Sequence, residues 1–186
     1  MAERICPWWA GYLLASPIRR WFEKPEEVLG PHLSSGATAL DVGCAMGFFS
    51  LPMAELVGPS GRVVCVDLQE RMIRSLRKRA ARAGLSDRIE TRVCSARSLG
   101  LRDLEGEIDF ALAYAVVHEV PDAAPFLAEI AEALAPGGRF LIAEPRGHVS
   151  EEALEATTAA AQRAGLSVVD RPVIKRSRTA LLEKPR

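Results

Sequence analysis

One stretch of the sequence combines a strand, a small-residue turn and a helix. Asp41 lies near the end of an apolar run that predicts a β-strand. Small residues follow at alternate positions, namely Gly43, Ala45 and Gly47, and a helix-like run covers Phe48–Val57. Small residues let the backbone approach a ligand closely, and the first turn of a helix presents free N–H groups. The stretch therefore predicts a nucleotide-type site, with Asp41 as a fixed acceptor beside it.

The spacing within this turn narrows the kind of nucleotide. A dinucleotide fingerprint needs a third glycine where Phe48 stands, and a phosphate loop needs a Lys-Ser or Lys-Thr pair after Gly47. Neither is present. Asp67 follows Gly47 by 20 positions and ends the next apolar run, where an acid can reach ribose hydroxyls. These features favour a ligand with a ribose and no phosphates, although Asp67 could instead cap the following helix.

The elements that must position these residues alternate along the chain. Apolar runs predict strands, and the periodic stretches between them predict helices, which is typical of a parallel sheet with helices on both faces. A tail after residue 165 supplies two further strands, the last of them suited to a hairpin near the sheet edge. The predicted strands are Ala39–Val42, Val63–Val66, Ile89–Cys94, Ile108–Ala115, Phe140–Ala143, Leu166–Val169 and Val173–Glu183, and the later helices are Gln69–Ala83, Ala123–Ala135 and Glu151–Ala164.

Turn and cap residues mark the ends of these elements. Ser16-Pro17 and Pro25-Glu26-Glu27 predict two short helices ahead of the first strand. Gly84 is placed to end a helix, and Pro136-Gly137-Gly138 predicts a turn before the fifth strand. None of these segments has the composition of a domain linker, so we expect a single domain over residues 1–186.

Composition limits the class of protein. The chain has 186 residues, of which 48% are hydrophobic and 26% charged, as in globular proteins. Lys and Arg total 24 and balance 24 Asp and Glu, so the net charge gives no reason to expect nucleic acid or a membrane as partner. Four cysteines without a C-x-x-C pair predict buried free thiols and a cytoplasmic protein, and they offer no metal-ligand cluster. A short apolar segment near the N-terminus resembles a signal core but better fits a helix.

Five segments of the chain form a series of motifs, namely Leu40–Gly47, Asp67, Ser95-Ala96, Asp109–Tyr114 and Leu134–Ile142. Taken in this order, they resemble the motifs of class I S-adenosylmethionine-dependent methyltransferases. The resemblance covers about residues 30–184. Two departures stand out, because Ala45 occupies a usual glycine position and Ser95 a common aspartate position.

This resemblance implies a doubly wound, Rossmann-like, seven-stranded, mostly parallel sheet with a C-terminal antiparallel hairpin. It implies S-adenosyl-L-methionine as cofactor, S-adenosyl-L-homocysteine as product, and an N-terminal helical lid over residues 1–35 on an α/β core over residues 36–186. Ser95 could equally be a helix cap. The residues expected at the cofactor are Asp41, Gly43, Ala45, Gly47, Phe49, Asp67, Leu68, Ser95, Ala96 and Tyr114.

Candidate catalytic and substrate residues follow the fourth and fifth predicted strands, where parallel sheets open their ligand crevice. His118 is the acid-base candidate, with a surface or helix-start histidine as the alternative. Arg146 and His148 follow the fifth strand and are candidates for the substrate pocket, as is Tyr12 in the predicted lid. Each could instead be a solvated loop residue or a packing residue.

The predicted function is methyl transfer to a small-molecule acceptor by in-line displacement. One alternative is an RNA or DNA methyltransferase that uses the arginine-rich helix at Arg71–Arg82, although a solvated helix face also explains that series. Another alternative is a regulator that binds S-adenosylmethionine without turnover. The sequence is compatible with a monomer or a homodimer, and it identifies neither the acceptor nor the atom that is methylated.

Overall fold

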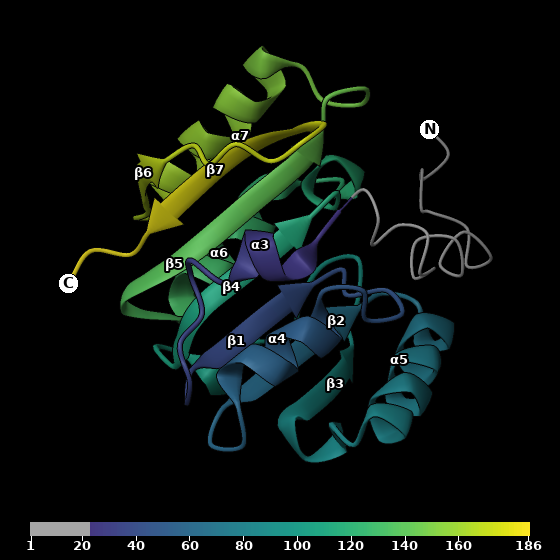
Figure 1. The fold of residues 1–186 in the computed structure, drawn as a ribbon. Helices are drawn as coiled ribbons and strands as arrows, with labels where there is room; N and C mark the ends of the chain where they lie inside the picture. Colours follow the sequence, from purple (N-terminus) through teal and green to yellow (C-terminus); the bar gives the residue numbers. More distant parts are fainter. Residues whose placement is uncertain (1–22) are drawn as a thin grey trace. The chain divides into compact units, whose positions relative to one another are not determined.

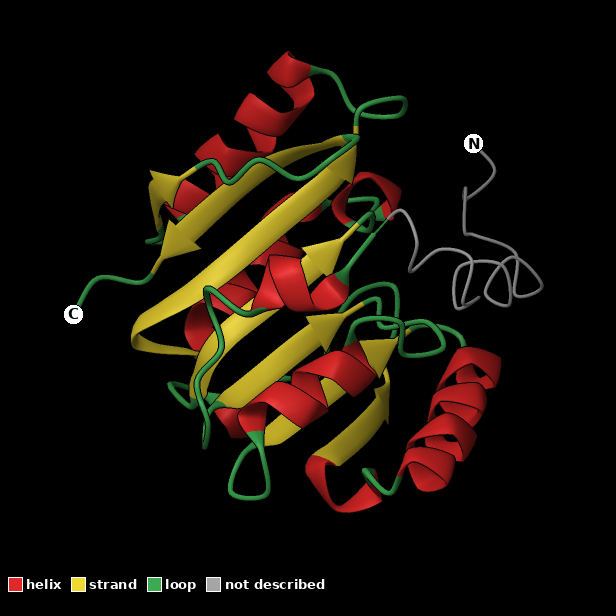
Figure 2. Ribbon diagram, viewed as in Figure 1, coloured by secondary structure: helices red, strands yellow, loops and turns green. Residues whose placement is uncertain are grey.

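The computed structural model describes residues 23–186 (Figure 1). These residues divide into two compact units. One unit ends at Cys94 and the other begins at Ser95. Two of the sequence predictions, the helix at Ser16-Pro17 and the substrate residue Tyr12, lie outside the described residues. Each unit alternates strands with helices (Figure 2), as the hydrophobic pattern predicts.

The N-terminal unit is built on three parallel strands in the order β3-β2-β1. The apolar runs of β1 and β2 are almost wholly buried, whereas β3, which pairs only with β2 among the strands of this unit, is partly exposed. Helix α4 packs on β1 and β2, and helix α5 packs on β2 and β3. The elements are α3 (Pro25–Leu29), β1 (Thr38–Val42), α4 (Ser50–Val57), β2 (Arg62–Asp67), α5 (Glu70–Ala83), a 3-10 turn (Ser86–Arg88) and β3 (Ile89–Val93).

Helix α5 illustrates why these residues form these elements. Its buried side chains, Met72, Ile73, Leu76 and Ala80, recur at helical spacing and face the strands. The helix ends at Gly84, which adopts a left-handed conformation with φ of 68° and donates its N–H to the last turn. Its arginines lie mainly on the exposed side, so the predicted amphipathic helix forms with its apolar face inward.

The C-terminal unit contains four strands in the order β4-β5-β7-β6. Strands β4 and β5 are parallel, and β7 runs antiparallel to both β5 and β6. Helix α6 packs on β5 and beside α7, which covers β6 and β7. The elements are a 3-10 turn (Arg102–Leu104), β4 (Ile108–Tyr114), a second 3-10 turn (Val117–Glu119), α6 (Ala123–Ala133), β5 (Leu134–Pro145), α7 (Glu151–Arg163), β6 (Ser167–Asp170) and β7 (Ser177–Glu183).

Strand β5 differs from its prediction. The segment Pro136-Gly137-Gly138 lies inside the strand, where we expected a turn that precedes it. The register moves from Leu134 opposite Ile108 to Arg139 opposite Phe110, so the extra residues form a bulge. Gly137, with φ of 81°, and Gly138 exchange backbone hydrogen bonds with Lys184, which keeps the bulged segment paired. The two glycines therefore form part of a β-bulge within β5, and the turn predicted there does not form.

The last predicted strand also begins later than expected. Residues 173–176 form a loop, and β7 starts at Ser177. Arg176 adopts a left-handed φ of 66° just before β7, which is incompatible with an extended strand at that position. The short strand β6 pairs only with β7, so the antiparallel C-terminal pair lies at the sheet edge as predicted.

The seven strands, parallel except for the C-terminal antiparallel pair, confirm the predicted α/β fold class. Within residues 23–186, every helix is too short or too polar to cross a lipid bilayer.

Candidate functional site

The turn after β1 adopts a backbone that small residues favour. Gly43, Ala45 and Gly47 all have positive φ values, of 68°, 46° and 84° respectively. The N–H groups of Gly43 and Cys44 both donate to the carbonyl of Val66, at 2.9 and 3.1 Å, so the turn is joined to the end of β2. The left-handed φ of Ala45 disfavours a residue with a Cβ. This explains why the methyltransferase resemblance expects glycine at position 45.

Asp67 links this turn to the start of α5. Its Oδ2 accepts a hydrogen bond from the N–H of Ala45 at 2.9 Å, and its Oδ1 accepts one from the N–H of Gln69 at 2.8 Å. The side chain is buried, and burial raises the pKa of this carboxyl despite the two backbone donors that lower it. A buried carboxylate at the carboxyl end of a parallel strand is suited to bind paired hydroxyls.

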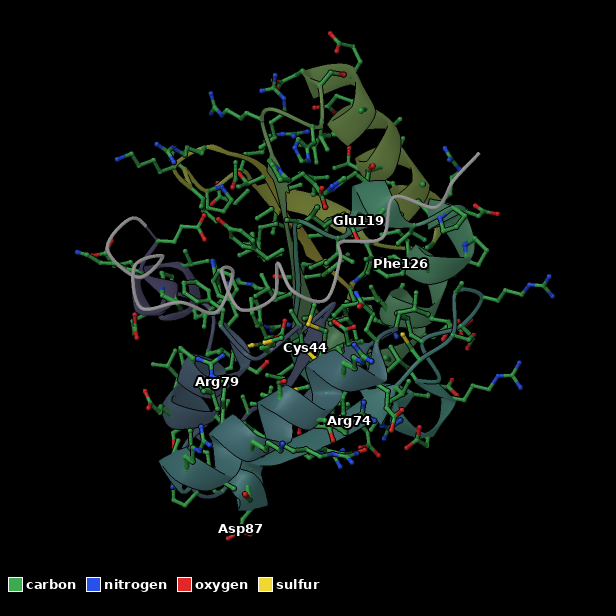
Figure 3. The ribbon with its side chains drawn as sticks, turned by 90° about the vertical axis from the view of Figure 1, so that its right-hand side faces the viewer. Cys44, Arg74, Arg79, Asp87, Glu119 and Phe126 are labelled. Carbon is green, nitrogen blue, oxygen red and sulfur yellow. The ribbon has the colours of Figure 1, made fainter. Side chains whose placement is uncertain are left out.

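Gly47 is needed for close packing between the turn and α5. A Cβ added there would lie 2.3 Å from Cδ1 of Leu76, which is completely buried. Arg79, one helical turn further along α5, donates a hydrogen bond from its guanidinium to the carbonyl of Met46. Figure 3 labels Arg79 and Cys44, which both belong to this N-terminal unit.

Asp41 and the buried thiols lie beneath the turn. Asp41 is 3% exposed and accepts a hydrogen bond from the hydroxyl of Ser50 at 2.5 Å, which ties β1 to the first residue of α4. Cys44 and Cys65 are buried and free, and burial together with their proximity raises the pKa of the Cys44 thiol well above its ordinary value. Cys44 is thus a buried free thiol, as the sequence predicted, and its raised pKa keeps it in the weakly reactive thiol form.

The remaining predicted cofactor residues of the N-terminal unit differ in exposure. Phe49 is buried, with its ring edge-on to Phe48 at a centroid distance of 5.2 Å. Leu68 is 37% exposed directly after Asp67, and Val93 is 50% exposed at the end of β3. Two apolar side chains are thus partly exposed at the carboxyl ends of the paired strands β2 and β3.

Ser95 forms a tight turn of its own. Its hydroxyl accepts hydrogen bonds from the N–H groups of Arg97, at 3.3 Å, and Ser98, at 3.1 Å. Glu129 of α6 then accepts hydrogen bonds from the hydroxyl of Ser98 and the N–H of Leu99 and Gly100. Ser95 thus caps a turn, and the neighbouring Ala96 is exposed. The sequence pattern gave no signal for Glu129, which lies 31 residues beyond Ser98.

Glu144 organises the loop after β4. It is 2% exposed, and its Oε1 accepts hydrogen bonds from the N–H of Val116 at 3.1 Å and of Val117 at 2.8 Å. Its Oε2 is hydrogen-bonded to Nδ1 of His118. Ala115, with φ of 59°, begins this loop in a left-handed conformation, which the surrounding hydrogen bonds hold.

The carboxylate determines the state of His118. Its hydrogen bond raises the pKa of the imidazole, Glu119 adds to the increase, and burial opposes it. An acceptor on Nδ1 favours the neutral form that carries its proton there, so Nε2 keeps a lone pair. The side chain of His118 is 22% exposed and can meet a ligand. Sequence reasoning chose His118 but did not assign this role to Glu144.

Three further predicted residues lie near this pair. The rings of His118 and His148 meet edge to face at a centroid distance of 5.5 Å. Arg146 donates from its Nε to the carbonyl of Ser177 at 3.1 Å, and the hydroxyls of Ser177 and Tyr114 lie 3.3 Å apart. Strands β4, β5 and β7 therefore bring His118, His148, Arg146 and Tyr114 into one cluster. No group of His, Cys, Asp and Glu among residues 23–186 has a geometry that could hold a metal ion.

Comparison with known proteins agrees with this architecture. A family model described as a methyltransferase domain matches residues 33–184. A SAM-dependent methyltransferase from Aquifex aeolicus superposes with a TM-score of 0.84 at 23% identity, covering 96% of this chain and 98% of that one. The chain therefore has the Rossmann-like methyltransferase fold, and it belongs to the methyltransferase domain family, in the class I S-adenosylmethionine-dependent group.

Two curated relatives show how widely this family varies. A ubiquinone biosynthesis O-methyltransferase from Caulobacter sp. (strain K31) is 38% identical over 108 residues, which is 58% of this chain and 40% of that protein. A ribosomal RNA small subunit methyltransferase G from Deinococcus radiodurans is 34% identical over 176 residues, which is 91% of this chain and 66% of that protein. The chain thus spans less than two thirds of the length of either relative.

Proposed function

We propose that this protein transfers a methyl group from S-adenosyl-L-methionine to an oxygen, or an acidic carbon, of a small-molecule acceptor. Membership of the methyltransferase domain family supports the cofactor, and the ubiquinone relative is an O-methyltransferase. The observation that carries the choice of acceptor atom is the hydrogen bond between Glu144 and Nδ1 of His118. It leaves Nε2 as a base, which only an acceptor that loses a proton requires.

The residues of the N-terminal unit fit the cofactor. The turn at Gly43–Gly47 already has its left-handed residues in place, and Asp67 holds it to β2. We propose that Asp67 accepts hydrogen bonds from the ribose hydroxyls, and that the exposed faces of Leu68 and Val93 border the adenine. The other predicted cofactor residues, Asp41, Phe49, Ser95, Ala96 and Tyr114, remain proposals, and Asp41 would act through the fold of the turn.

The cofactor, when bound, supplies an electrophilic methyl group on a sulfonium. The protein's own part is to align the acceptor and to take up its proton. His118, neutral and held at Nδ1 by Glu144, would accept that proton at Nε2, for which general-base catalysis contributes roughly 10²–10⁴-fold. Glu144 would then stabilise the imidazolium, because its carboxylate favours the charged ring.

The test of this function is a binding and turnover measurement. Calorimetry should detect binding of S-adenosyl-L-methionine and S-adenosyl-L-homocysteine, and Asp67→Ala should weaken both. Asp87→Asn, an exposed change on the turn before β3, is the matched control and should bind normally. Absence of binding to either compound, or equal binding by Asp67→Ala, would reject the proposal.

A second candidate is methylation of RNA, favoured by the ribosomal RNA methyltransferase that matches 91% of the chain. Salt-dependent binding of an RNA oligonucleotide would support it, because phosphate contacts weaken steeply with salt. The balance of 24 basic and 24 acidic residues gives no general attraction for RNA, so we prefer the small molecule. A regulator that binds the cofactor without turnover would show binding and no product.

We also propose that residues 1–186 form one methyltransferase domain, with residues 1–35 as a lid, and that the protein is cytoplasmic and a monomer or a homodimer. The family model, which reaches from residue 33 to 184, supports the single domain. The buried free thiols of Cys44 and Cys65 suit a reducing compartment.

A further inference from the structure

The loops beside His118 carry positive charge that no carboxylate neutralises. Arg146, Lys175 and Arg176 are exposed, and none of them has an ion-pair partner among residues 23–186. Other cations of the same unit are paired, for example Arg171 with Glu155 at 2.7 Å. Arg146, Lys175 and Arg176 therefore place three unpaired cations on the loop after β5 and the loop before β7.

Backbone contacts bring the two loops together. The N–H of Arg146 donates to the carbonyl of Arg176 at 3.0 Å, so the loop after β5 lies against the loop before β7. The Nε of Arg146 donates to the carbonyl of Ser177, which is buried and lies beside Tyr114. The guanidinium is therefore held at one nitrogen while its two terminal nitrogens keep their donors.

The position of Arg146 relates this charge to the acid-base pair. Arg146 precedes His148 by two residues, and the His148 ring contacts that of His118. The carboxylates nearby are committed elsewhere, because Glu144 binds His118 and Glu151 pairs with Arg178 at 3.4 Å. Glu119 directly follows His118 in the sequence and raises the pKa of that imidazole, and Glu152 lies in the first turn of α7, where it interacts with Arg178.

We infer that the acceptor is a small molecule that carries a carboxylate, and that Arg146 binds this carboxylate with its two terminal nitrogens while His118 faces the hydroxyl to be methylated. Arginine presents a planar pair of donors that matches a carboxylate, and a partly fixed side chain loses less entropy on binding. Lys175 and Arg176 would add attraction at longer range. This inference rests on the proposed function, whose acceptor it specifies.

The experiment uses the full chain saturated with S-adenosyl-L-homocysteine and two matched probes, 4-hydroxybenzoate and 4-hydroxybenzamide. Binding is followed by calorimetry and by the imidazole NMR signals of His118 and His148. We expect the benzoate to bind at least about tenfold more tightly than the neutral amide, because a paired arginine and carboxylate form charge-assisted hydrogen bonds. It should also shift both imidazole signals.

Variants distinguish paired hydrogen bonding by the Arg146 guanidinium from general electrostatic attraction. Arg146→Gln should lose about tenfold in benzoate affinity, Arg146→Lys should lie between, and Arg171→Gln, which removes an equal charge from the same region, should match wild type. Equal binding of the two probes, no binding of either, or equal losses in Arg146→Gln and Arg171→Gln would overturn the inference. So would salt-sensitive binding of an RNA oligonucleotide that Arg146→Gln abolishes.

Failure of the proposed function and failure of the carboxylate inference give different experimental results. If S-adenosyl-L-homocysteine does not bind, calorimetry of that compound alone reveals it, and the benzoate titration can still be made on the free protein. If the cofactor product binds normally and the benzoate does not, the function stands and the carboxylate inference falls.

Discussion

Glu144 and His118 lie 26 residues apart in the sequence, and the buried carboxylate of the first is hydrogen-bonded to Nδ1 of the second. The same carboxylate accepts two backbone N–H groups from the residues just before the histidine. One side chain therefore fixes both the path of the loop and the tautomer of the ring. Its consequences for rate and stability can be measured.

The first prediction concerns the pH dependence of turnover. Because Glu144 raises the pKa of His118, the neutral ring becomes available only as pH rises above the ordinary histidine range. We expect kcat/KM to increase with pH through that raised pKa. In Glu144→Gln the rising limb should move to lower pH, because the carboxylate is lost, while the maximal rate falls because the amide can donate to Nδ1 and place the ring proton on Nε2.

His118→Asn provides the reference for this profile. It should lower the maximal rate by roughly 10²–10⁴-fold and remove the rising limb, as expected when a general base is lost. Cofactor affinity measured by calorimetry should be unchanged. An unaltered limb in both variants would show that another group accepts the proton.

The second prediction concerns stability and pH. The pKa of His118 is higher in the folded protein than in the unfolded chain, so the folded state binds the proton more tightly. The stabilisation is fully present below the unfolded pKa of about 6.5 and is lost as pH rises through the folded value. Urea unfolding of wild type and His118→Asn at several pH values should show a difference that shrinks as pH rises. A difference that grows with pH would contradict the pairing.

The third prediction concerns the cofactor and Asp67. Burial raises the pKa of this carboxyl, so protonation begins at a higher pH than for an exposed aspartate. Affinity for S-adenosyl-L-methionine should decrease on acidification through that raised pKa. Asp67→Asn should bind about 10- to 100-fold more weakly at pH 7, since hydrogen bonds to charged groups contribute about 1.5–3 kcal/mol, and should lose the dependence. The measurement is calorimetry across pH, with Asp87→Asn as control.

The fourth prediction concerns Ala45, whose φ of 46° strains a residue with a Cβ. Ala45→Gly should raise the free energy of unfolding by about 0.5–1 kcal/mol, the relief of strain being partly offset by unfolded-chain entropy. Ala54→Gly, in the buried interior of α4, should instead lower it by about 1 kcal/mol. Equal signs for the two changes, measured by urea unfolding, would refute the strain argument.

The fifth prediction concerns Gly47. Gly47→Ala places a Cβ 2.3 Å from Leu76 and also forces alanine into a left-handed φ. Gly84→Ala imposes the same backbone strain at the end of α5, where a Cβ meets nothing within 4 Å. We expect Gly47→Ala to cost about 1–3 kcal/mol more than Gly84→Ala, the overpacking component alone. Similar losses would mean that the Leu76 side chain moves aside easily.

The fold was predictable because its strands are short apolar runs bounded by glycine and polar turns. Helix α5 begins within one residue of its predicted start and ends at its predicted residue. Its apolar spacing marks the helix, and Gly84 marks its end. Strand β5 was predicted too short, because Pro136–Gly138 has turn composition but is kept in the strand by hydrogen bonds to Lys184, 46 or more residues away. Local patterns contain no information on such a partner.

The candidate site divides in the same way. The turn at Gly43–Gly47 could be predicted because the spacing of its small residues alone marks it. The sequence did not reveal Glu144 as the partner of His118, or Glu129 as the acceptor for the turn at Ser98. Each glutamate is distant in the sequence from the residues to which it is hydrogen-bonded. The turn that the Ser95 hydroxyl holds became visible only in its hydrogen bonds, and its contact with the cofactor stays a prediction.

The two backbone hydrogen bonds that Asp67 accepts also affect the rate of cofactor binding. Because Ala45 and Gln69 are already joined through one carboxylate, the turn has its shape before any ligand arrives. Little ordering entropy is then spent when a ligand binds there. Cofactor association should accordingly be a single fast step without a slow rearrangement of this turn, and departure should be the rate that varies among mutants of the site.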